Sequence, residues 1–232
     1  MTVEHLTRRF GGLTAVDDLT FRADRGAILG LLGPNGAGKT TTLLCLAGLL
    51  RPNAGAMELD GKHLGADRGR VIALIPESPE VYAMLTVWEH LVFIAKSCRL
   101  EDGWQQRAQE LLLRLDLFEK RDTLGEALSK GMRQKTLIAS TVLAGAPVLL
   151  LDEPMIGLDP KGQRELRSIL LELRNAGTAI VLSTHLLESA EALCDQVLVM
   201  NHGRAVISSP ISELRFGELG RSLEDVFLEA TQ

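Results

Sequence analysis

The strongest chemical signal in the sequence is a glycine-rich loop suited to holding phosphate groups. Residues 33–40 read Gly-Pro-Asn-Gly-Ala-Gly-Lys-Thr and match the pattern G-x-x-x-x-G-K-[ST]. The apolar run Ala27–Leu32 precedes the loop, and the helical stretch Thr41–Leu50 follows it. Glycines let several backbone N–H groups converge on an anion, and the positive end of the following helix points at the same place. Lys39 adds a full charge, and the Thr40 hydroxyl is suited to Mg²⁺.

We therefore expect this loop to bind a nucleoside triphosphate. The residues expected to contact the phosphates are Asn35, Gly36, Ala37, Gly38, Lys39, Thr40 and Thr41. A plain glycine-rich turn is the alternative. The strand-like run before the loop and the helical run after it both favour the phosphate-binding interpretation.

Two adjacent carboxylates, Asp152 and Glu153, follow the apolar run Val148–Leu151. The carboxyl end of a parallel strand opens onto the ligand crevice of a sheet. Successive side chains of a strand point in opposite directions, so the two acids should differ in role. We expect Asp152 to lie near Mg²⁺, directly or through water, and Glu153 to orient and partly deprotonate an attacking water. An ordinary acidic turn after a strand is the alternative.

Two further segments could meet a phosphate. His185 follows another apolar run. A His at the end of a strand is usually a structural hydrogen-bonder, but here this would be the third strand end to converge on the same crevice, so we expect His185 to contact the γ-phosphate. Ser129 suits a helix N-cap before the helical stretch Thr136–Leu143, and Gly131 permits close approach. A routine helix cap is the alternative for Ser129. Because one triphosphate hardly needs two cradles from one chain, the economical arrangement is a head-to-tail pair in which each chain's Ser129 closes over the other's nucleotide.

The elements that must position these residues alternate between strand and helix, which predicts an α/β sheet. Four runs are apolar on both sides, as is typical of buried parallel strands: Ala27–Leu32, Val71–Ile75, Val148–Leu151 and Ala179–Ser183. Helical periodicity appears at Ala108, Leu111, Leu112 and Leu115, and again at Leu166, Ile169, Leu170 and Leu173. The first 25 residues carry β-like runs with turn residues at Gly11-Gly12 and Asp17-Asp18, which predicts a small antiparallel edge.

The composition disfavours a nucleic-acid-binding protein, a disulfide-rich protein and a membrane-spanning protein. The 232 residues include 25 Lys and Arg against 30 Asp and Glu, and this balance of −5 argues against a nucleic acid as the main partner. Cys45, Cys98 and Cys194 have no metal-ligand spacing and suggest no disulfide framework, which fits a reducing compartment. No signal-peptide pattern is present, and apolar runs such as Leu43–Leu50 fall short of the ~18 residues that span a bilayer. We expect a cytoplasmic chain that acts at a membrane only through a partner.

Taken in order along essentially the whole chain, these residues resemble the ATP-binding subunits of ATP-binding cassette (ABC) transporters. Gly33–Thr41 resembles the Walker A motif, and Leu149–Glu153 resembles Walker B with its catalytic Glu. Leu128–Gln134 is similar to the family signature, usually Leu-Ser-Gly-Gly-Gln. Gly157-Leu158-Asp159 resembles the D-loop, which implies that Asp159 lies at the nucleotide, and His185 resembles the switch His.

The resemblance implies further roles. Phe10 falls where the family places an aromatic that stacks on adenine, with Val16 nearby, and an ordinary core Phe is the alternative. Ile75-Pro76-Glu77 matches the Q-loop region, so Glu77 would be a ligand of Mg²⁺. A membrane permease would dock beside Glu77–Trp88. The apolar side chains that would contact it, unless they belong to the subdomain core, are Val81, Tyr82, Met84 and Leu85.

Some residues depart from the family pattern. Glu77 stands where Gln is usual, and its carboxylate can ligate Mg²⁺ but adds negative charge near the γ-phosphate, which would slow the reaction or weaken binding. The signature has Lys130 for a Gly and Met132 for Gln, and a Lys near a phosphate does not oppose closure. These departures, together with the ending Ser222–Leu228, resemble the bacterial exporter-type branch of the family.

The implied fold is an α/β P-loop NTPase (RecA-like) core with a small N-terminal antiparallel β part and an inserted helical subdomain. The core would comprise residues 1–78 and 147–232, and the mostly helical segment 79–146 would carry the signature. The implied cofactors are ATP and Mg²⁺. The implied partners are a second copy or a related ATPase subunit, which together sandwich two ATP molecules, and an exporter permease that holds the pair peripherally on the inner face of the cell membrane.

A soluble ATPase of the same superfamily, acting on DNA or ribosomes, is the alternative. DNA-acting members carry a long coiled coil between the phosphate loop and the signature, whereas only 88 positions separate Thr40 from Leu128 here. Ribosome-acting members usually carry two ATPase units, and this chain has one. A non-catalytic nucleotide-binding adaptor is disfavoured because Glu153 and His185 are both present. The sequence does not identify a transported substrate.

Overall fold

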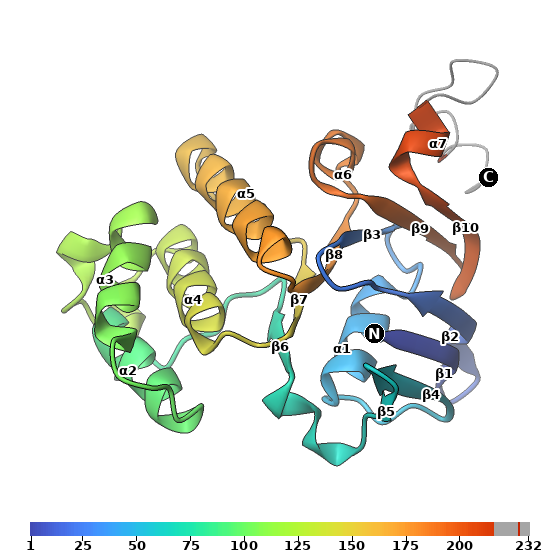
Figure 1. Ribbon diagram of the computed structural model, residues 1–232, viewed down its shortest axis with the longest axis horizontal. Coiled ribbons are helices and arrows are strands. Elements are labelled where there is room, and N and C mark those ends of the chain that lie inside the picture. The colour runs from blue at the N-terminus through green and yellow to red at the C-terminus, as the bar shows by residue number, and fades with distance from the viewer. Residues whose placement is uncertain (216–226, 228–232) are drawn as a thin grey trace. The chain divides into compact units, whose positions relative to one another are not determined.

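The computed structural model describes residues 1–215 and Phe227. The segment Ser222–Leu228, on which the exporter-branch resemblance partly rests, lies outside the described residues except for Phe227. The chain forms two compact units, and the helices and strands of each are labelled in Figure 1. Unit 1 comprises residues 1–74, 147–153 and the chain from Leu173 onward, and unit 2 comprises residues 75–146 and 154–172. Within the described part of the chain, no helix combines the length and the apolar character needed to cross a bilayer.

A six-stranded sheet in the order β10-β9-β3-β8-β7-β6 is the main element of unit 1. Its strands are β3 (Ile28–Leu32), β6 (Ile72–Ile75), β7 (Val148–Asp152), β8 (Ala179–Thr184), β9 (Gln196–Asn201) and β10 (Arg204–Pro210). β3 pairs in parallel with β8 and β9, β7 pairs in parallel with β8, and β10 is antiparallel to β9. Every residue of β3, β7 and β8 is buried, so the prediction of buried parallel strands from these apolar runs is confirmed.

A smaller antiparallel sheet, in the order β2-β1-β4-β5, confirms the predicted N-terminal β part. Its strands are β1 (Thr2–Phe10), β2 (Leu13–Arg22), β4 (Ala54–Leu59) and β5 (Lys62–His63). Gly11-Gly12 forms the turn between β1 and β2, as predicted.

The predicted turn at Asp17-Asp18 is wrong, because both residues lie inside β2. The β1–β2 register shifts between Leu6 and Arg8, opposite this pair, and Asp18 has φ 55°. Asp adopts this left-handed backbone more readily than most residues, so the irregularity is a bulge within a continuous strand. His5 Nδ1 lies 2.7 Å from the Asp18 carboxylate across the bulge.

Helix α1 (Lys39–Ala47) packs into the hydrophobic core of unit 1. Leu43 and Leu46 are buried in the same core cluster as side chains of both sheets, such as Leu6 and Leu150. The helix ends three residues before the predicted Leu50 because Gly48 adopts a left-handed C-cap with φ 80°. The other helical segments of this unit are α6 (Leu187–Leu193), α7 (Ile211–Arg215) and the 3₁₀ turn Ala66–Arg70.

Unit 2 is helical. Its helices are α2 (Val87–Ser97), α3 (Trp104–Arg114), α4 (Lys130–Ala144) and α5 (Pro160–Asn175), with 3₁₀ turns at Phe118–Lys120 and Gly125–Ala127. α4 packs against α2 and α3. We predicted residues 154–172 as part of the RecA-like core, whereas their contacts place them in unit 2 with helices α2, α3 and α4. Arg114 of α3 illustrates this grouping, because its guanidinium donates to both carboxylate oxygens of Glu172 on α5 at 2.7 and 2.8 Å.

Candidate functional site

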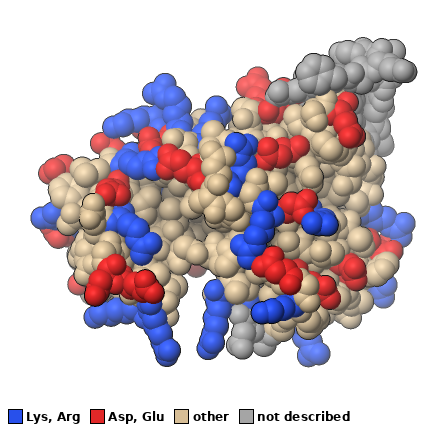
Figure 2. All heavy atoms as spheres, in the orientation of Figure 1, with Lys and Arg blue, Asp and Glu red and all other residues tan. Residues whose placement is uncertain are grey.

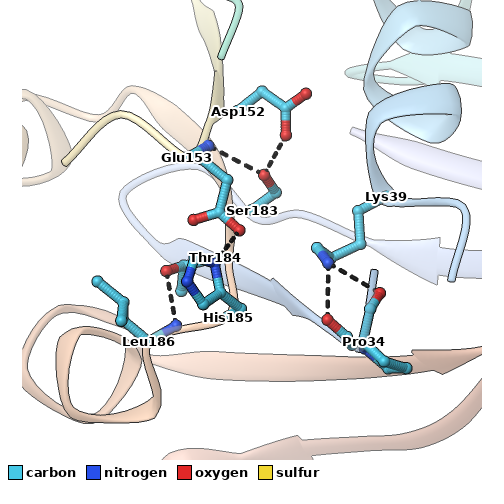
Figure 3. Close-up of polar contacts among 9 residues, drawn as sticks. Pro34, Lys39, Asp152, Glu153, Ser183, Thr184, His185 and Leu186 are labelled. Carbon is cyan, nitrogen blue, oxygen red and sulfur yellow. Dashed lines mark hydrogen bonds and ion pairs between the residues drawn. The ribbon is translucent and has the colours of Figure 1, made fainter. Parts of the chain in front are cut away.

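The phosphate loop, the acidic pair and His185 leave the large sheet at the same edge. β3 pairs in parallel with β8 so that Leu32 lies opposite Thr184, and β7 pairs with β8 so that Asp152 lies opposite Ser183. The carboxyl ends of the three strands therefore coincide. With strands spaced about 4.8 Å apart, β3 and β7 stand roughly 10 Å apart on either side of β8. Figure 3 shows the side chains that these strand ends bring into one region.

Glycine is required at two positions of the phosphate loop. A Cβ atom on Gly33 would lie 2.4 Å from the carbonyl oxygen of Met200. Gly38 has φ 103°, and a Cβ atom there would lie 2.3 Å from the carbonyl oxygen of Ala15. Gly36 also has a left-handed φ of 82°, but the space around it is open. The loop therefore depends on backbone shape at both ends, where neighbouring backbone atoms leave no room for a side chain.

Lys39 lies inside the loop and is buried. Its ammonium group donates to the carbonyl oxygen of Gly33 at 2.6 Å and to that of Pro34 at 3.1 Å. Figure 3 shows Lys39 beside Pro34. Gly38 is the N-cap of α1, and no side chain caps this helix. A cation beside a helix N-terminus whose first amides face no capping side chain is a suitable site for an anion. The loop therefore fits the phosphates of a nucleotide.

The predicted phosphate contacts differ in their exposure. Asn35, Gly36 and Thr40 are exposed, and Thr41 is half-buried. Ala37 is buried, and its N–H donates to the carbonyl oxygen of Pro34 at 3.1 Å. The expected nucleotide contacts of these residues stay predictions, and the Ala37 amide would have to exchange its present partner to make one.

Asp152 and Glu153 are both buried and are held apart by a residue that sequence reasoning missed, Ser183 of β8. The Ser183 hydroxyl donates to a carboxylate oxygen of Asp152 and accepts the N–H of Glu153 at 3.1 Å. Glu153 has φ 47°, a left-handed conformation that is uncommon outside glycine. Ser183 therefore supports the backbone turn that separates the two carboxylates. The only sequence signal was a hydroxyl at the end of an apolar strand.

Glu153 and His185 form a hydrogen-bonded pair. His185 Nδ1 donates to Glu153 Oε1 at 2.8 Å (Figure 3). An ionised Glu153 can only accept this hydrogen bond, and Nδ1 then carries the proton while Nε2 is left for another partner. The His185 side chain is half exposed while that of Glu153 is nearly buried. Such a pair can orient a water molecule and accept its proton.

The donor groups at this edge also fit Mg²⁺. Among residues 1–215 and Phe227, no three His, Cys, Asp or Glu side chains lie together as a metal-binding group. Mg²⁺ usually keeps several waters and is held by one or two protein groups together with substrate phosphates. Asp152, with its carboxylate at the strand end, and the exposed Thr40 hydroxyl are suitable donors. Glu77 is exposed and belongs to unit 2, and its expected metal contact stays a prediction.

Phe10 and Val16 differ in their access to solvent. Phe10 is 43% exposed, so the alternative of an ordinary core Phe is wrong. The Arg8 guanidinium carbon lies 4.4 Å from the centre of the Phe10 ring, a cation–π geometry. Val16 is 0% exposed, so its side chain lies beneath the surface. Stacking of adenine on Phe10 and contact with Val16 both stay predictions.

Comparison with known proteins identifies the family of this chain. A family model described as ABC transporter matches residues 16–156. The chain belongs to the ABC transporter family. It is 37% identical over 231 residues to Nod factor export ATP-binding protein I of Ralstonia nicotianae, covering 98% of this chain and 72% of that protein.

Two solved structures extend the family assignment to the fold. A structure of the ATP-binding subunit of an ABC transporter matches with a TM-score of 0.94 and 34% identity, covering 100% of this chain and 99% of the other. CbiO1 from Clostridium perfringens, part of the ABC transporter complex cbiONQ, matches with a TM-score of 0.78 and 27% identity, covering 94% and 91%. The predicted P-loop NTPase fold is therefore confirmed, and the chain is an ABC transporter ATP-binding subunit.

The segment that resembles the ABC signature lies in unit 2 at the start of α4. Ser129 is the N-cap, and its hydroxyl accepts the N–H of Met132 at 3.3 Å, so the predicted cap is confirmed. The helix begins at Lys130, six residues before the predicted start at Thr136. A Cβ atom on Gly131 would lie 2.8 Å from the carbonyl oxygen of Gly157, so this Gly approaches the D-loop of its own chain. Contact of Ser129 and Gly131 with a nucleotide stays a prediction.

The D-loop residue Asp159 is exposed but has partners within unit 2. Its carboxylate lies 3.1 Å from Lys135 Nζ and accepts the N–H of Gly162 at 3.2 Å. The hydrogen bond from Lys135 is the main cause that lowers the pKa of Asp159 below its ordinary value. Asp159 therefore caps the first turn of α5, and its expected contact with nucleotide stays a prediction.

Proposed function

We propose that this ABC subunit hydrolyses ATP with Glu153 as the base and does so as a head-to-tail dimer that drives a membrane permease. The observation that carries the proposal is the Glu153–His185 pair, which lies at the same sheet edge as the phosphate loop. A buried carboxylate oriented by an imidazole, next to a phosphate-binding loop, is what activation of a water toward phosphoryl transfer requires.

In the proposed reaction each residue of unit 1 has one task. Lys39 and the backbone amides around Gly38 hold the phosphates, and Thr40 and Asp152 hold Mg²⁺, which neutralises phosphate charge when bound. Glu153 orients the attacking water and accepts its proton. His185 keeps Glu153 in place through Nδ1 and presents Nε2 toward the γ-phosphate.

The proposed dimer rests on the signature. Ser129 is exposed, and it caps the 15-residue helix α4, whose N-terminus suits an anion. Its own chain already provides one phosphate loop, so we assign the second anion-binding element to the nucleotide of a partner, either another copy or a related ATPase subunit.

The proposed permease contact rests on a surface cavity in unit 2 of about 390 Å³. Aromatic and aliphatic side chains line it, including Tyr82, Phe93 and Leu137. Tyr82 packs edge-on against Phe93 and stacks on His90, while His90 Nε2 accepts the N–H of Tyr82 at 2.9 Å. Exposed aromatic surface with a fixed backbone favours docking of a protein segment. Three of the lining residues, Glu80, Val81 and Tyr82, belong to the expected docking stretch Glu77–Trp88.

The direction of transport and the location are also proposals. The Ralstonia relative carries export in its name, which supports our proposal of an exporter. CbiO1 is part of a named ABC transporter complex, which supports a peripheral location on the inner face of the cell membrane through a permease. On the face shown in Figure 2, Lys and Arg are interspersed with Asp and Glu, which favours a protein partner over a nucleic acid.

The test is Glu153→Gln, compared with Glu119→Gln, an exposed carboxylate of unit 2. We expect Glu153→Gln to lower the ATPase rate by about 10²–10⁴-fold while ATP is still bound, because the base is removed and the phosphate loop is kept. With ATP and Mg²⁺, light scattering should show a stable dimer for this variant. A Glu153→Gln variant with the wild-type ATPase rate, or one that stays monomeric with ATP and permease, would contradict the proposal.

A further inference from the structure

Lys135, in the second turn of α4, is a lysine buried in the helical unit. The residue is only 9% exposed, and lysines are seldom buried without a partner. Its partner is Asp159, whose carboxylate oxygen lies 3.1 Å from Lys135 Nζ. The same oxygen accepts the N–H of Gly162 in the first turn of α5. One carboxylate therefore caps α5 and binds a cation of α4.

Two other contacts attach the same loop to the same helix. Gln134, only 1% exposed, donates from Nε2 to the carbonyl oxygen of Pro154 at 3.4 Å. Gly131 approaches Gly157 so closely that a Cβ atom would lie 2.8 Å from its carbonyl oxygen. The loop 154–159 is thus held to the first two turns of α4 near its start, its middle and its end.

The side chains of the Lys135–Asp159 ion pair leave no room for a side chain at Gly162. A Cβ atom there would lie 2.7 Å from the Asp159 oxygen and 3.0 Å from Lys135 Cε. The methylene chain of Lys135 and the Asp159 carboxylate therefore occupy space that only glycine leaves available. Both geometry and charge fix where the D-loop lies relative to the signature helix.

We propose that Lys135 is a positioning residue that, through Asp159, joins the signature segment and the D-loop into one rigid element. This inference rests on the proposed function, because the element would act on the nucleotide of the partner chain. The phosphate loop of the same chain belongs to unit 1, whereas Lys135 and Asp159 both belong to unit 2. Lys135 should therefore govern closure of the dimer and turnover, and leave nucleotide binding by the isolated chain unchanged.

The first test is Lys135→Met, which removes the charge and keeps most of the apolar side chain. Its matched control is Lys161→Met, because Lys161 also pairs with a carboxylate, Asp116 at 3.3 Å, but is well exposed. We expect Lys135→Met to lower kcat on the order of ten-fold, with the Kd of the monomer for ATP changed less than about two-fold. Lys135→Arg should restore kcat, and the control should behave as wild type.

Asp159→Asn tests whether the effect passes through the pair. If it does, the double variant Lys135→Met/Asp159→Asn should be no slower than either single variant, because the second change removes an interaction already lost. Additive losses would overturn the inference. So would a Lys135→Met variant whose kcat is unchanged, or one whose monomer Kd for ATP rises as much as kcat falls.

Hydrogen exchange on the monomeric chain separates this inference from the proposed function. Lys135→Met should speed exchange of the amides of residues 157–162 at least about ten-fold and leave those of β3 and β8 unchanged. Should Glu153→Gln fail to dimerise while this local change appears, the dimer proposal fails and the rigid element stands. Unchanged exchange in residues 157–162 would overturn the rigid element, whatever the oligomeric state.

Discussion

The phosphate loop and the acidic corner formed by Asp152 and Glu153 lie at the same edge of one sheet, but they are built differently. The loop owes its shape to backbone packing, since Gly33 and Gly38 each face a carbonyl oxygen too close for a side chain. The corner owes its shape to side-chain hydrogen bonds that come from another strand, through Ser183 and His185. Binding should therefore be sensitive to added atoms in the loop, and turnover to removed donors at the corner.

The largest expected effect is at Gly38. Gly38→Ala places a methyl group 2.3 Å from the carbonyl oxygen of Ala15 on a backbone with φ 103°. We expect ATP affinity to fall by more than about 100-fold and the free energy of unfolding to fall by roughly 2–4 kcal/mol, because backbone atoms must shift. Calorimetry with ATP and chemical denaturation would measure both.

Gly11→Ala is the control for this substitution. Gly11 also has a left-handed φ, 57°, but nothing lies within 4 Å of a Cβ atom there. Gly11→Ala should lower the free energy of unfolding by only about 1 kcal/mol, through backbone strain, and should leave the affinity for ATP unchanged. Equal effects of the two substitutions on ATP affinity would show that backbone crowding does not shape the loop.

A smaller effect is expected at the acidic corner. Ser183→Ala leaves the buried Asp152 carboxylate without its hydroxyl donor, whereas the Glu153 N–H loses the hydroxyl but keeps the Ser183 carbonyl oxygen at 3.2 Å. An unpaired buried polar group costs about 1–3 kcal/mol, so kcat should fall by roughly 5- to 100-fold while the Kd for ATP stays near that of wild type. Ser208→Ala, an exposed serine of β10, is the matched control. A change in Kd larger than the change in kcat would remove the contrast between the two regions.

The smallest expected effect concerns the two buried cysteines, Cys45 in α1 and Cys194 at the end of α6. Burial raises the pKa of the Cys194 thiol to about 12, and it also raises the pKa of Cys45, whereas Cys98 is exposed. At pH 7–8 we expect a thiol reagent to label one cysteine, and Cys98→Ser should abolish labelling of the folded chain. Labelling of Cys194 before unfolding would show that this thiol, which packs against Gly30 of β3, becomes accessible in the folded chain.

The contrast also explains what the sequence could predict. The strand–loop–helix arrangement at residues 33–40 and the position of Glu153 at a strand end were predictable because their signals are local: eight consecutive residues, and a carboxylate at the end of an apolar run. The role of Ser183 was not, because it depends on the register between β7 and β8, which are separated by a helix. The predicted turn at Asp17-Asp18 failed for a related reason, since pairing with β1 keeps these residues in a strand.

In unit 2, too, features that depend on contacts between distant segments could not be predicted from the sequence. The early start of α4 follows from Ser129 as a cap, a signal that the sequence contained, but the periodic apolar pattern begins only later in the helix. The contact of Lys135 with Asp159 joins residues 24 positions apart through packing alone. No local pattern distinguishes this Lys from an exposed one.

The left-handed backbone of Glu153 has a consequence for how activity can be lost. Its N–H donates to both the hydroxyl and the carbonyl oxygen of Ser183, so the backbone keeps this turn as long as β7 and β8 remain paired at this end. Local separation of β7 from β8 at this corner should therefore be one route to loss of turnover, in addition to dissociation of the proposed dimer.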